Sequence, residues 1–278
     1  MSTDAPPPAP PQSPLATPLP WDLVSTAYEE LVVPKFEAYA RDALRLAAAP
    51  PGSRLLDVAC GPGTLALLAA GDAAQVDALD FSVDMVGRLK TRAARNGIGN
   101  IIAVVGDGQA LPYEDGVFAA AFSMFGLIFF PDRAAGFREL CRVLRPGGRA
   151  VVSSWQPMEK VFAFNLLMTA LGELMPGLGF GKGKAPLGDG DEFRAELGAA
   201  GFSATELHEV VHAHEFADVD AFWADTSRSM APLVLLRSRI GEPGWLELEK
   251  QLLGRLRERA GGGPVTLEMR AWLGVGTR

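Results

Sequence analysis

The chain has 278 residues, 48% of them hydrophobic and 21% charged, and its 26 basic and 33 acidic residues give a formal net charge of -7 at pH 7. This composition suffices for a hydrophobic core and is too apolar for a wholly disordered chain. The acidic balance argues against a general nucleic-acid-binding protein, which would need a basic surface to neutralise phosphates.

Cysteine content and hydropathy bear on location. Cys60 and Cys141 are too few for a disulfide framework, so we expect a reducing, cytoplasmic environment. The longest apolar stretch, residues 118–130, is shorter than the roughly 20 residues of a membrane span. The N-terminal residues lack the basic start and apolar core of a secretory signal, so we expect no membrane association.

The first 50 residues fall into two parts. Residues 1–20 are rich in proline, which fixes φ and lacks an N–H, so they are expected to form a disordered tail. A proline-rich ligand for a partner domain is the alternative. Residues 23–48 predict two short helices separated near Pro34, so we assign residues 21–50 to N-terminal helices.

Residues 51–155 alternate between short apolar runs and helical patterns. Strands are predicted over residues 54–59, 75–79, 101–105, 117–122 and 149–154, and helices over 64–70, 83–96 and 133–144. Such alternation with short connections indicates βαβ units and a parallel sheet with helices on both faces.

The regularity stops after residue 155. Residues 156–264 predict a helical insert with one strand at 205–216. They include a glycine-rich loop, 176–190, which has the composition of a mobile lid and is equally compatible with a passive connector. Residues 265–278 contain a last strand, so we treat residues 21–278 as one domain.

A glycine turn, Asp57-Val-Ala-Cys-Gly-Pro-Gly-Thr64, lies between the first predicted strand and helix. The pattern G-x-G-x-x-A from Gly61, with Asp80 placed to hold a ribose, formally matches a dinucleotide site. However, Pro62 removes an N–H that a pyrophosphate would use, and the Asp57 carboxylate would repel that dianion. The turn therefore favours a cationic ligand such as S-adenosylmethionine.

Four stretches carry a family resemblance: LLDVACGPGTLALLAA (55–70), VDALDFSVDMV (76–86), VVGDGQALPYEDGVFAAAFSMFGLIFF (104–130) and FRELCRVLRPGGRAVVSSW (137–155). Together they resemble the class I S-adenosylmethionine-dependent methyltransferases, in particular the group similar to the ubiquinone/menaquinone-biosynthesis methyltransferases. The resemblance implies an α/β, Rossmann-like fold. This fold has a seven-stranded, mostly parallel sheet with helices on both faces, an antiparallel last strand and a helical lid insert.

The resemblance also implies roles for particular residues. Asp57 and the glycine turn would surround the methionine part of the cofactor, Asp80 the ribose, and Asp107 the adenine amino group. Ala59 stands where the family usually has its first glycine. The full set of implied cofactor residues is Asp57, Ala59, Gly61, Gly63, Asp80, Phe81, Met85, Asp107, Gly108, Gln109 and Ser123.

On the acceptor side the sequence says less. The candidate substrate residues, which could equally be core residues, are Tyr28, Phe125, Trp155, Phe162, Phe222 and Trp223. Tyr28, His212 and His214 are weak candidates for a general base. His208, His212 and His214 share one face of the strand at 205–216, but that strand would form the edge of the sheet, so a solvated face is favoured over a metal or catalytic site. We expect no metal.

The expected function is in-line methyl transfer from S-adenosylmethionine to an oxygen, nitrogen or carbon of a small molecule. A nicotinamide-dependent oxidoreductase and a catalytically silent cofactor-binding regulatory protein are the alternatives. Methylation of nucleic acid or protein is disfavoured by the acidic charge. The sequence indicates neither the acceptor nor the oligomeric state.

Overall fold

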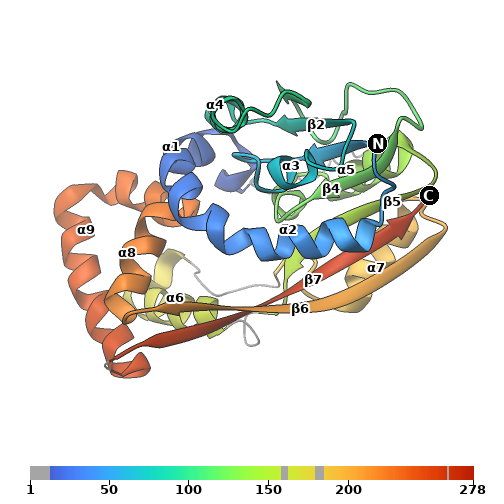
Figure 1. Cartoon of the computed structure of the whole chain (residues 1–278). Helices are drawn as coiled ribbons and strands as arrows, with labels where there is room; N and C mark the ends of the chain where they lie inside the picture. Colours follow the sequence, from blue (N-terminus) through green and yellow to red (C-terminus); the bar gives the residue numbers. More distant parts are fainter. Residues whose placement is uncertain (1–12, 158–161, 179–184, 262) are drawn as a thin grey trace, which may run out of the picture.

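A seven-stranded sheet forms the centre of the computed structural model, which describes residues 13–157, 162–178, 185–261 and 263–278 (Figure 1). The strand order is β3-β2-β1-β4-β5-β7-β6, and only β7 runs antiparallel to its two neighbours. The strands are β1 (Arg54–Val58), β2 (Gln75–Asp80), β3 (Ile101–Val105), β4 (Phe118–Ser123), β5 (Leu144–Trp155), β6 (Ala204–Phe216) and β7 (Val265–Thr277). The predicted fold class is confirmed.

Helices cover both faces of the sheet. On one face, α2 (Val33–Ala47), α3 (Thr64–Ala69) and α4 (Val83–Arg95) pack in one apolar cluster, and on the other α5 (Arg133–Val143) and α7 (Gly190–Ala199) pack in a second. In α4 the buried residues Val86, Leu89 and Ala93 recur at helical spacing, so one stripe of the helix meets the sheet. Because the strands are buried from both sides, they are almost continuously apolar.

A separate helical lobe is built on the far part of β6 and β7. Only residues 271–277 of β7 pair with β5, so residues 265–270 pair with β6 alone, and the two strands extend beyond the rest of the sheet (Figure 1). Around this ribbon lie α6 (Phe162–Leu174), α8 (Val219–Ser229) and α9 (Ala231–Ala260), with η5 (Pro176–Leu178) after α6.

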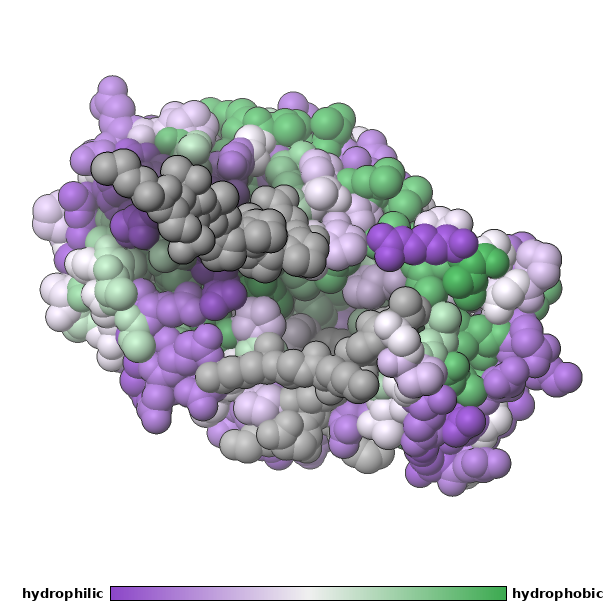
Figure 2. Space-filling model, turned by 180° about the vertical axis from the view of Figure 1, so that it is seen from behind, coloured by the Kyte–Doolittle hydropathy of each residue, from purple (hydrophilic) through white to green (hydrophobic). Residues whose placement is uncertain are grey.

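On the face opposite to that in Figure 1, the surface is largely hydrophilic at its ends and hollowed in the middle (Figure 2).

The N-terminal segment departs from the prediction. Residues 1–12 lie outside the described residues, but residues 13–20 are not a disordered tail, because they form η1 (Pro14–Ala16) and begin α1 (Leu19–Ala27). The Ser13 side chain accepts a hydrogen bond from the Leu15 N–H, and Pro14 occupies the first helical position, where its missing N–H has no cost.

The predicted break near Pro34 was also wrong. A π-helical turn, η2 (Tyr28–Val32), joins α1 to α2 without interruption, since Pro34 falls in the first turn of α2, where proline is tolerated. Within the described ranges, no helix combines the length and the apolar character needed to cross a membrane.

Candidate cofactor site

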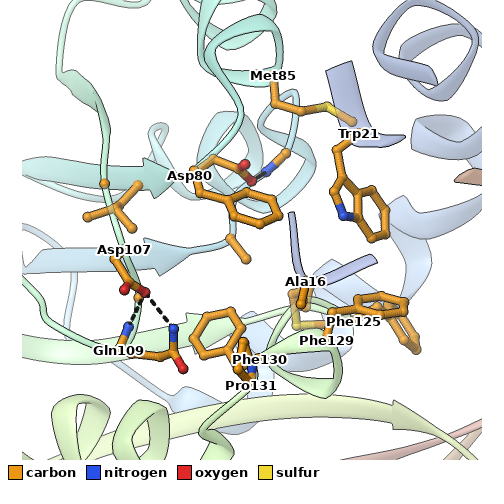
Figure 3. A pocket seen from close by; sticks show the side chains of 18 of the residues that line it. Ala16, Trp21, Asp80, Met85, Asp107, Gln109, Phe125, Phe129, Phe130 and Pro131 are labelled. Atoms are coloured by element: carbon orange, nitrogen blue, oxygen red, sulfur yellow. Dashed lines mark hydrogen bonds between the residues drawn. The ribbon is translucent and has the colours of Figure 1, made fainter. Parts of the chain in front are cut away.

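A cavity with about 700 Å³ of empty space lies at the carboxyl ends of the parallel strands, where the order reverses between β1 and β4 (Figure 3). This is the usual ligand position in an open α/β sheet. The loops after β1, β2, β3 and β4 supply most of its wall, and the N-terminal segment closes the remaining side. The lining residues that bear on the argument are Ala59, Gly61, Asp80, Phe81, Met85, Asp107, Gly108, Gln109, Phe125, Ala16, Trp21 and Tyr28.

Asp80 ends β2 with its carboxylate fixed at the cavity wall. One oxygen accepts the Gly61 N–H at 2.8 Å and the other accepts the Ser82 N–H at 2.9 Å. Burial is the largest influence on this carboxyl and raises its pKa to about 6, although the two N–H bonds oppose the shift. A carboxylate has free lone pairs beyond these two bonds, so Asp80 can still accept hydroxyl groups from the cavity.

Asp57 lies deeper, at the end of β1. It is almost fully buried and accepts the Ala66 N–H at 3.1 Å, so it caps α3 from a distance. Burial raises its pKa to about 8. Asp57 also lines an adjoining cavity of about 390 Å³, which shares Tyr28 and Phe125 with the first, so its carboxyl group is available to a ligand that spans both.

The glycine turn itself offers few donors. The Gly61 N–H binds Asp80, Pro62 has no N–H, and the Gly63 N–H donates to the Cys60 carbonyl at 3.0 Å. Gly63 has a left-handed φ of 83°, and a Cβ there would lie 2.2 Å from Leu89 Cδ1, so its role is conformational and steric rather than one of ligand contact.

The opposite side of the cavity is formed by the loop after β3. Asp107 Oδ1 accepts both the backbone N–H of Gln109, at 2.9 Å, and its side-chain amide, at 3.0 Å (Figure 3). Gly108 is buried, and a Cβ there would lie 2.4 Å from the Phe130 ring. Asp107 is therefore both a turn residue and a cavity residue.

Two of the candidate substrate residues, Tyr28 and Phe125, lie on the wall of both cavities. Trp155 lies behind them, stacked on Phe125 with ring centroids 4.2 Å apart. Among the described residues, the Tyr28 hydroxyl has no hydrogen-bond partner. Burial, followed by the nearby charge of Asp80, raises the pKa of Tyr28 well above its usual range, so the phenol stays protonated and is unsuited to act as a base.

Other predicted site residues lie elsewhere. Ser123 is fully buried and its hydroxyl accepts the Leu127 N–H, so it shapes the turn after β4 rather than the cavity wall. Phe222 and Trp223 belong to the apolar core of the helical lobe, where the Trp223 indole donates to Glu249 at 2.7 Å. The Phe162 side chain lies outside the described residues.

The histidines are not at either cavity. His212 lies 2.8 Å from the Asp42 carboxylate and packs against Tyr39, and His214 is half-buried, with its pKa lowered by desolvation and by Lys35. They are less solvated than predicted because α2 covers this side of β6. The described residues contain no cluster of potential ligands suited to a metal ion.

The described part of the predicted lid lies away from the cavities, while residues 158–161 and 179–184 lie outside the described residues. No described residue of 156–264 lines either cavity, and residues 185–188 of the glycine-rich loop are fixed on the sheet, with Leu187 buried and the Pro186 carbonyl accepting the Ser154 hydroxyl at 2.6 Å. The roof instead comes from Ala16, Trp21 and Tyr28, the first two of which the prediction missed. A signal existed in Ser13-Pro14, which has the form of a helix start.

Residues 55–148 match a family described as "Methyltransferase domain". This stretch of the chain is therefore similar to a methyltransferase domain. Its sequence is 38% identical over 133 residues to a demethylmenaquinone methyltransferase of Beutenbergia cavernae, covering 46% of this chain and 53% of the relative. It is 43% identical over 124 residues to that of Mycolicibacterium vanbaalenii, covering 44% and 50%. The match thus spans about half the length of each curated relative.

Solved structures share the methyltransferase fold over most of the chain. The YcgJ protein of Bacillus subtilis has a TM-score of 0.62 at 18% identity, covering 87% of this chain and 98% of that chain. Phosphoethanolamine N-methyltransferase 2 of Haemonchus contortus, solved with S-adenosylhomocysteine, has a TM-score of 0.58 at 16% identity, covering 92% and 57%. The [4+2]-cyclase SpnF has a TM-score of 0.59 at 18% identity, covering 96% and 97%. At these identities the likeness shows the fold alone.

The methyltransferase domain fits S-adenosylmethionine on three counts. Asp80 offers a carboxylate to ribose hydroxyls, the cavity wall beyond it is largely apolar and aromatic, and the buried Asp57 can balance a cationic group. Each feature matches one part of that cofactor.

Proposed function

We propose that the chain transfers a methyl group from S-adenosylmethionine to a small-molecule acceptor. The observation that carries this proposal is the hydrogen bonding of the glycine turn. The N–H groups of Gly61 and Gly63 already donate to acceptors within the protein, and Pro62 between them has no N–H. A pyrophosphate would find no free donor in these three residues and would instead face the carboxyl groups of Asp57 and Asp80, whose ionised forms repel it. The same arrangement suits a ligand that is positively charged and has no phosphate.

In this proposal each part of the cavity holds one part of the cofactor. Asp80 accepts the ribose hydroxyls, Phe81 and Met85 contact the adenine, and Asp57 faces the methionine end. Asp107 accepts from the adenine amino group, with Gly108 and Gln109 holding its loop. When bound, the cofactor would supply an electrophilic methyl group on its sulfonium, and S-adenosylhomocysteine would be the leaving group when a nucleophile attacks that methyl carbon in line.

The residues of the chain then orient the acceptor and exclude water. Tyr28, Phe36 and Phe125 form an aromatic wall at the adjoining cavity, next to Asp57. The protonated Tyr28 hydroxyl can donate a hydrogen bond to a polar atom of the acceptor. Because this wall is aromatic, we propose a largely apolar acceptor. We also propose that its oxygen, nitrogen or carbon nucleophile reacts without a histidine or lysine base, since no histidine or lysine of the described chain lines either cavity.

Asp80→Ala tests the proposed site. Removing the carboxylate loses the acceptor for the ribose hydroxyls, so we expect at least a tenfold loss of S-adenosylhomocysteine affinity, roughly 1.4 kcal/mol. Isothermal calorimetry measures it, with Asp72→Ala as a control because Asp72 is an exposed acid outside the cavity. Equal affinity in all three proteins would remove Asp80 from the cofactor site.

We further propose a cytoplasmic location. Cys60 and Cys141 are both free and buried, as expected of thiols in a reducing compartment.

A further inference from the structure

The N-terminal helix α1 lies directly over the adenosine side of the cavity. The Trp21 ring meets Phe129 edge-on, with centroids 4.9 Å apart, and its indole N–H donates to the Leu15 carbonyl at 2.9 Å. This bond folds the preceding turn back so that Ala16 also reaches the cavity wall (Figure 3). The segment from residue 13 to Trp21 therefore closes a side that the strands leave open.

A chain of hydrogen bonds connects α1 to the carboxylate of Asp80. The Asp22 carboxylate accepts the hydroxyl of Ser82, which is fully buried and caps α4 by accepting the Met85 N–H at 3.1 Å. The Ser82 backbone N–H in turn donates to Asp80 at 2.9 Å. The orientation of Asp80 thus depends on Ser82, and that of Ser82 on a residue of α1.

A second contact holds α1 in the same position. Arg88 of α4 donates to the Ser25 hydroxyl and the Glu29 carboxylate, both at 3.0 Å, and to the Thr26 hydroxyl. Four polar residues of the N-terminal segment therefore contact Arg88 of α4 and Ser82, the residue that caps this helix. Because the bonds from Arg88 to Ser25 and Glu29 are partly shielded from water, they fix the helix more firmly than exposed pairs would.

We propose that α1 is part of the cofactor site and that Asp22 is its positioning residue, which through Ser82 couples the docking of α1 to the ribose-binding carboxylate of Asp80. This inference rests on the proposed function, since it takes S-adenosylmethionine or its demethylated product as the ligand.

The charge of Asp22 also affects the pKa of Asp80. It is a like charge close to Asp80 and contributes, after burial, to raising the pKa of Asp80. The other titratable groups around Asp80 are Asp57 of β1, Cys60 of the glycine turn and Tyr28 of η2, and Asp107 lines the same cavity from β3. Removing the Asp22 charge alone should lower the pKa of Asp80, so that its ionised form persists to lower pH.

Two substitutions separate the two roles. Asp22→Asn keeps an oxygen that can accept the Ser82 hydroxyl but removes the charge, whereas Asp22→Ala removes both. Asp84→Asn is the matched control, because Asp84 lies in the first turn of α4, is exposed and does not line the cavity. The measurement is calorimetric affinity for S-adenosylhomocysteine between about pH 5 and pH 8, with thermal unfolding as a check on folding.

We expect Asp22→Ala to lose at least tenfold in affinity at pH 8 and Asp22→Asn to lose less than about threefold. The pH at which affinity falls should move down in Asp22→Asn and stay unchanged in Asp84→Asn. Wild-type affinity in Asp22→Ala together with an unmoved pH profile in Asp22→Asn would overturn the inference. If the wild-type protein itself does not bind S-adenosylhomocysteine, the proposed function fails as well.

Discussion

Two residues with side chains at the cavity wall have left-handed backbone, Ala59 with φ of 55° and Phe125 with φ of 56°. This conformation costs a non-glycine residue of order 1 kcal/mol or more and is concentrated at functional sites. At Ala59 the family resemblance expects glycine, and the structure shows the reason, because the position needs a positive φ. The methyl group of Ala59 is accommodated because residue 126 is glycine.

The pair Ala59 and Gly126 gives a residue-scale prediction. A Cβ at residue 126 would lie 2.3 Å from the Ala59 Cβ, while its next contacts are at 3.4 Å or more. Gly126→Ala should therefore destabilise the protein by about 1–3 kcal/mol through overpacking. Ala59→Gly should restore most of this loss in the double variant, since it removes the clashing methyl group and relieves a positive φ.

Chemical denaturation of the wild-type protein, the two single variants and the double variant measures the coupling. If Gly126→Ala is as destabilising in the Ala59→Gly background as in the wild-type background, the steric account of this turn is wrong.

At the scale of elements, the π-helical turn η2 sets the orientation of η1 and α1 relative to α2. A π turn contains one residue more than an α turn, and such turns are frequent at functional sites. Here it allows Tyr28 to line the cavity while α2 still packs on the sheet.

Deleting Glu30 tests this element. Without one residue the helix can close as a regular α-helix, which rotates the preceding segment by about 100° relative to α2. Trp21, Asp22 and Tyr28 would leave their positions, so we expect at least a tenfold loss of S-adenosylhomocysteine affinity with helical content preserved by circular dichroism. Glu30→Ala keeps the turn and should bind normally, because Glu30 is exposed and pairs only with Arg228 among the described residues. Normal binding by the deletion variant would show that η2 is incidental.

The sequence predicted the strands and helices of residues 51–155 well because local pattern and tertiary burial agree there. The glycine turn, Asp57 and Asp80 could be found because the carboxyl ends of parallel strands meet at one edge, and Asp107 could be found through the family resemblance. The N-terminal roof could not, since the position of Trp21 depends on Phe129 and that of Asp22 on Ser82, both distant in the sequence. For the same reason Phe222 and Trp223 could not be separated from cavity residues by composition, as buried aromatic residues look alike in either place.

For the whole molecule, the buried carboxyls make stability depend on pH. Burial raises the pKa of Asp57 to about 8, against about 4 in the unfolded chain, so the folded state binds this proton more tightly. The contribution of Asp57 to the stability of the unligated protein is therefore lost progressively as the pH rises from about 4, and the loss levels off above about pH 8. Asp80 acts in the same direction up to about pH 6.

Asp57→Asn removes the larger of these effects. We expect its thermal midpoint in the absence of ligand to exceed that of the wild-type protein increasingly between about pH 5 and pH 8, while its affinity for a cationic cofactor falls. A constant difference in midpoint across this range would mean that Asp57 titrates normally.

The whole fold, by contrast, does not determine the reaction, since the similar solved structures include both a methyltransferase and a [4+2]-cyclase. The central claim instead concerns the ligand. The carboxyl groups of Asp57 and Asp80, together with the Gly61 and Gly63 N–H groups that already donate within the protein, favour S-adenosylmethionine over a pyrophosphate-containing cofactor. The most direct measurement is calorimetric titration of the wild-type protein with S-adenosylhomocysteine and, in parallel, with NAD. We predict micromolar-range binding of the first and none of the second, whereas binding of NAD without S-adenosylhomocysteine would contradict the account.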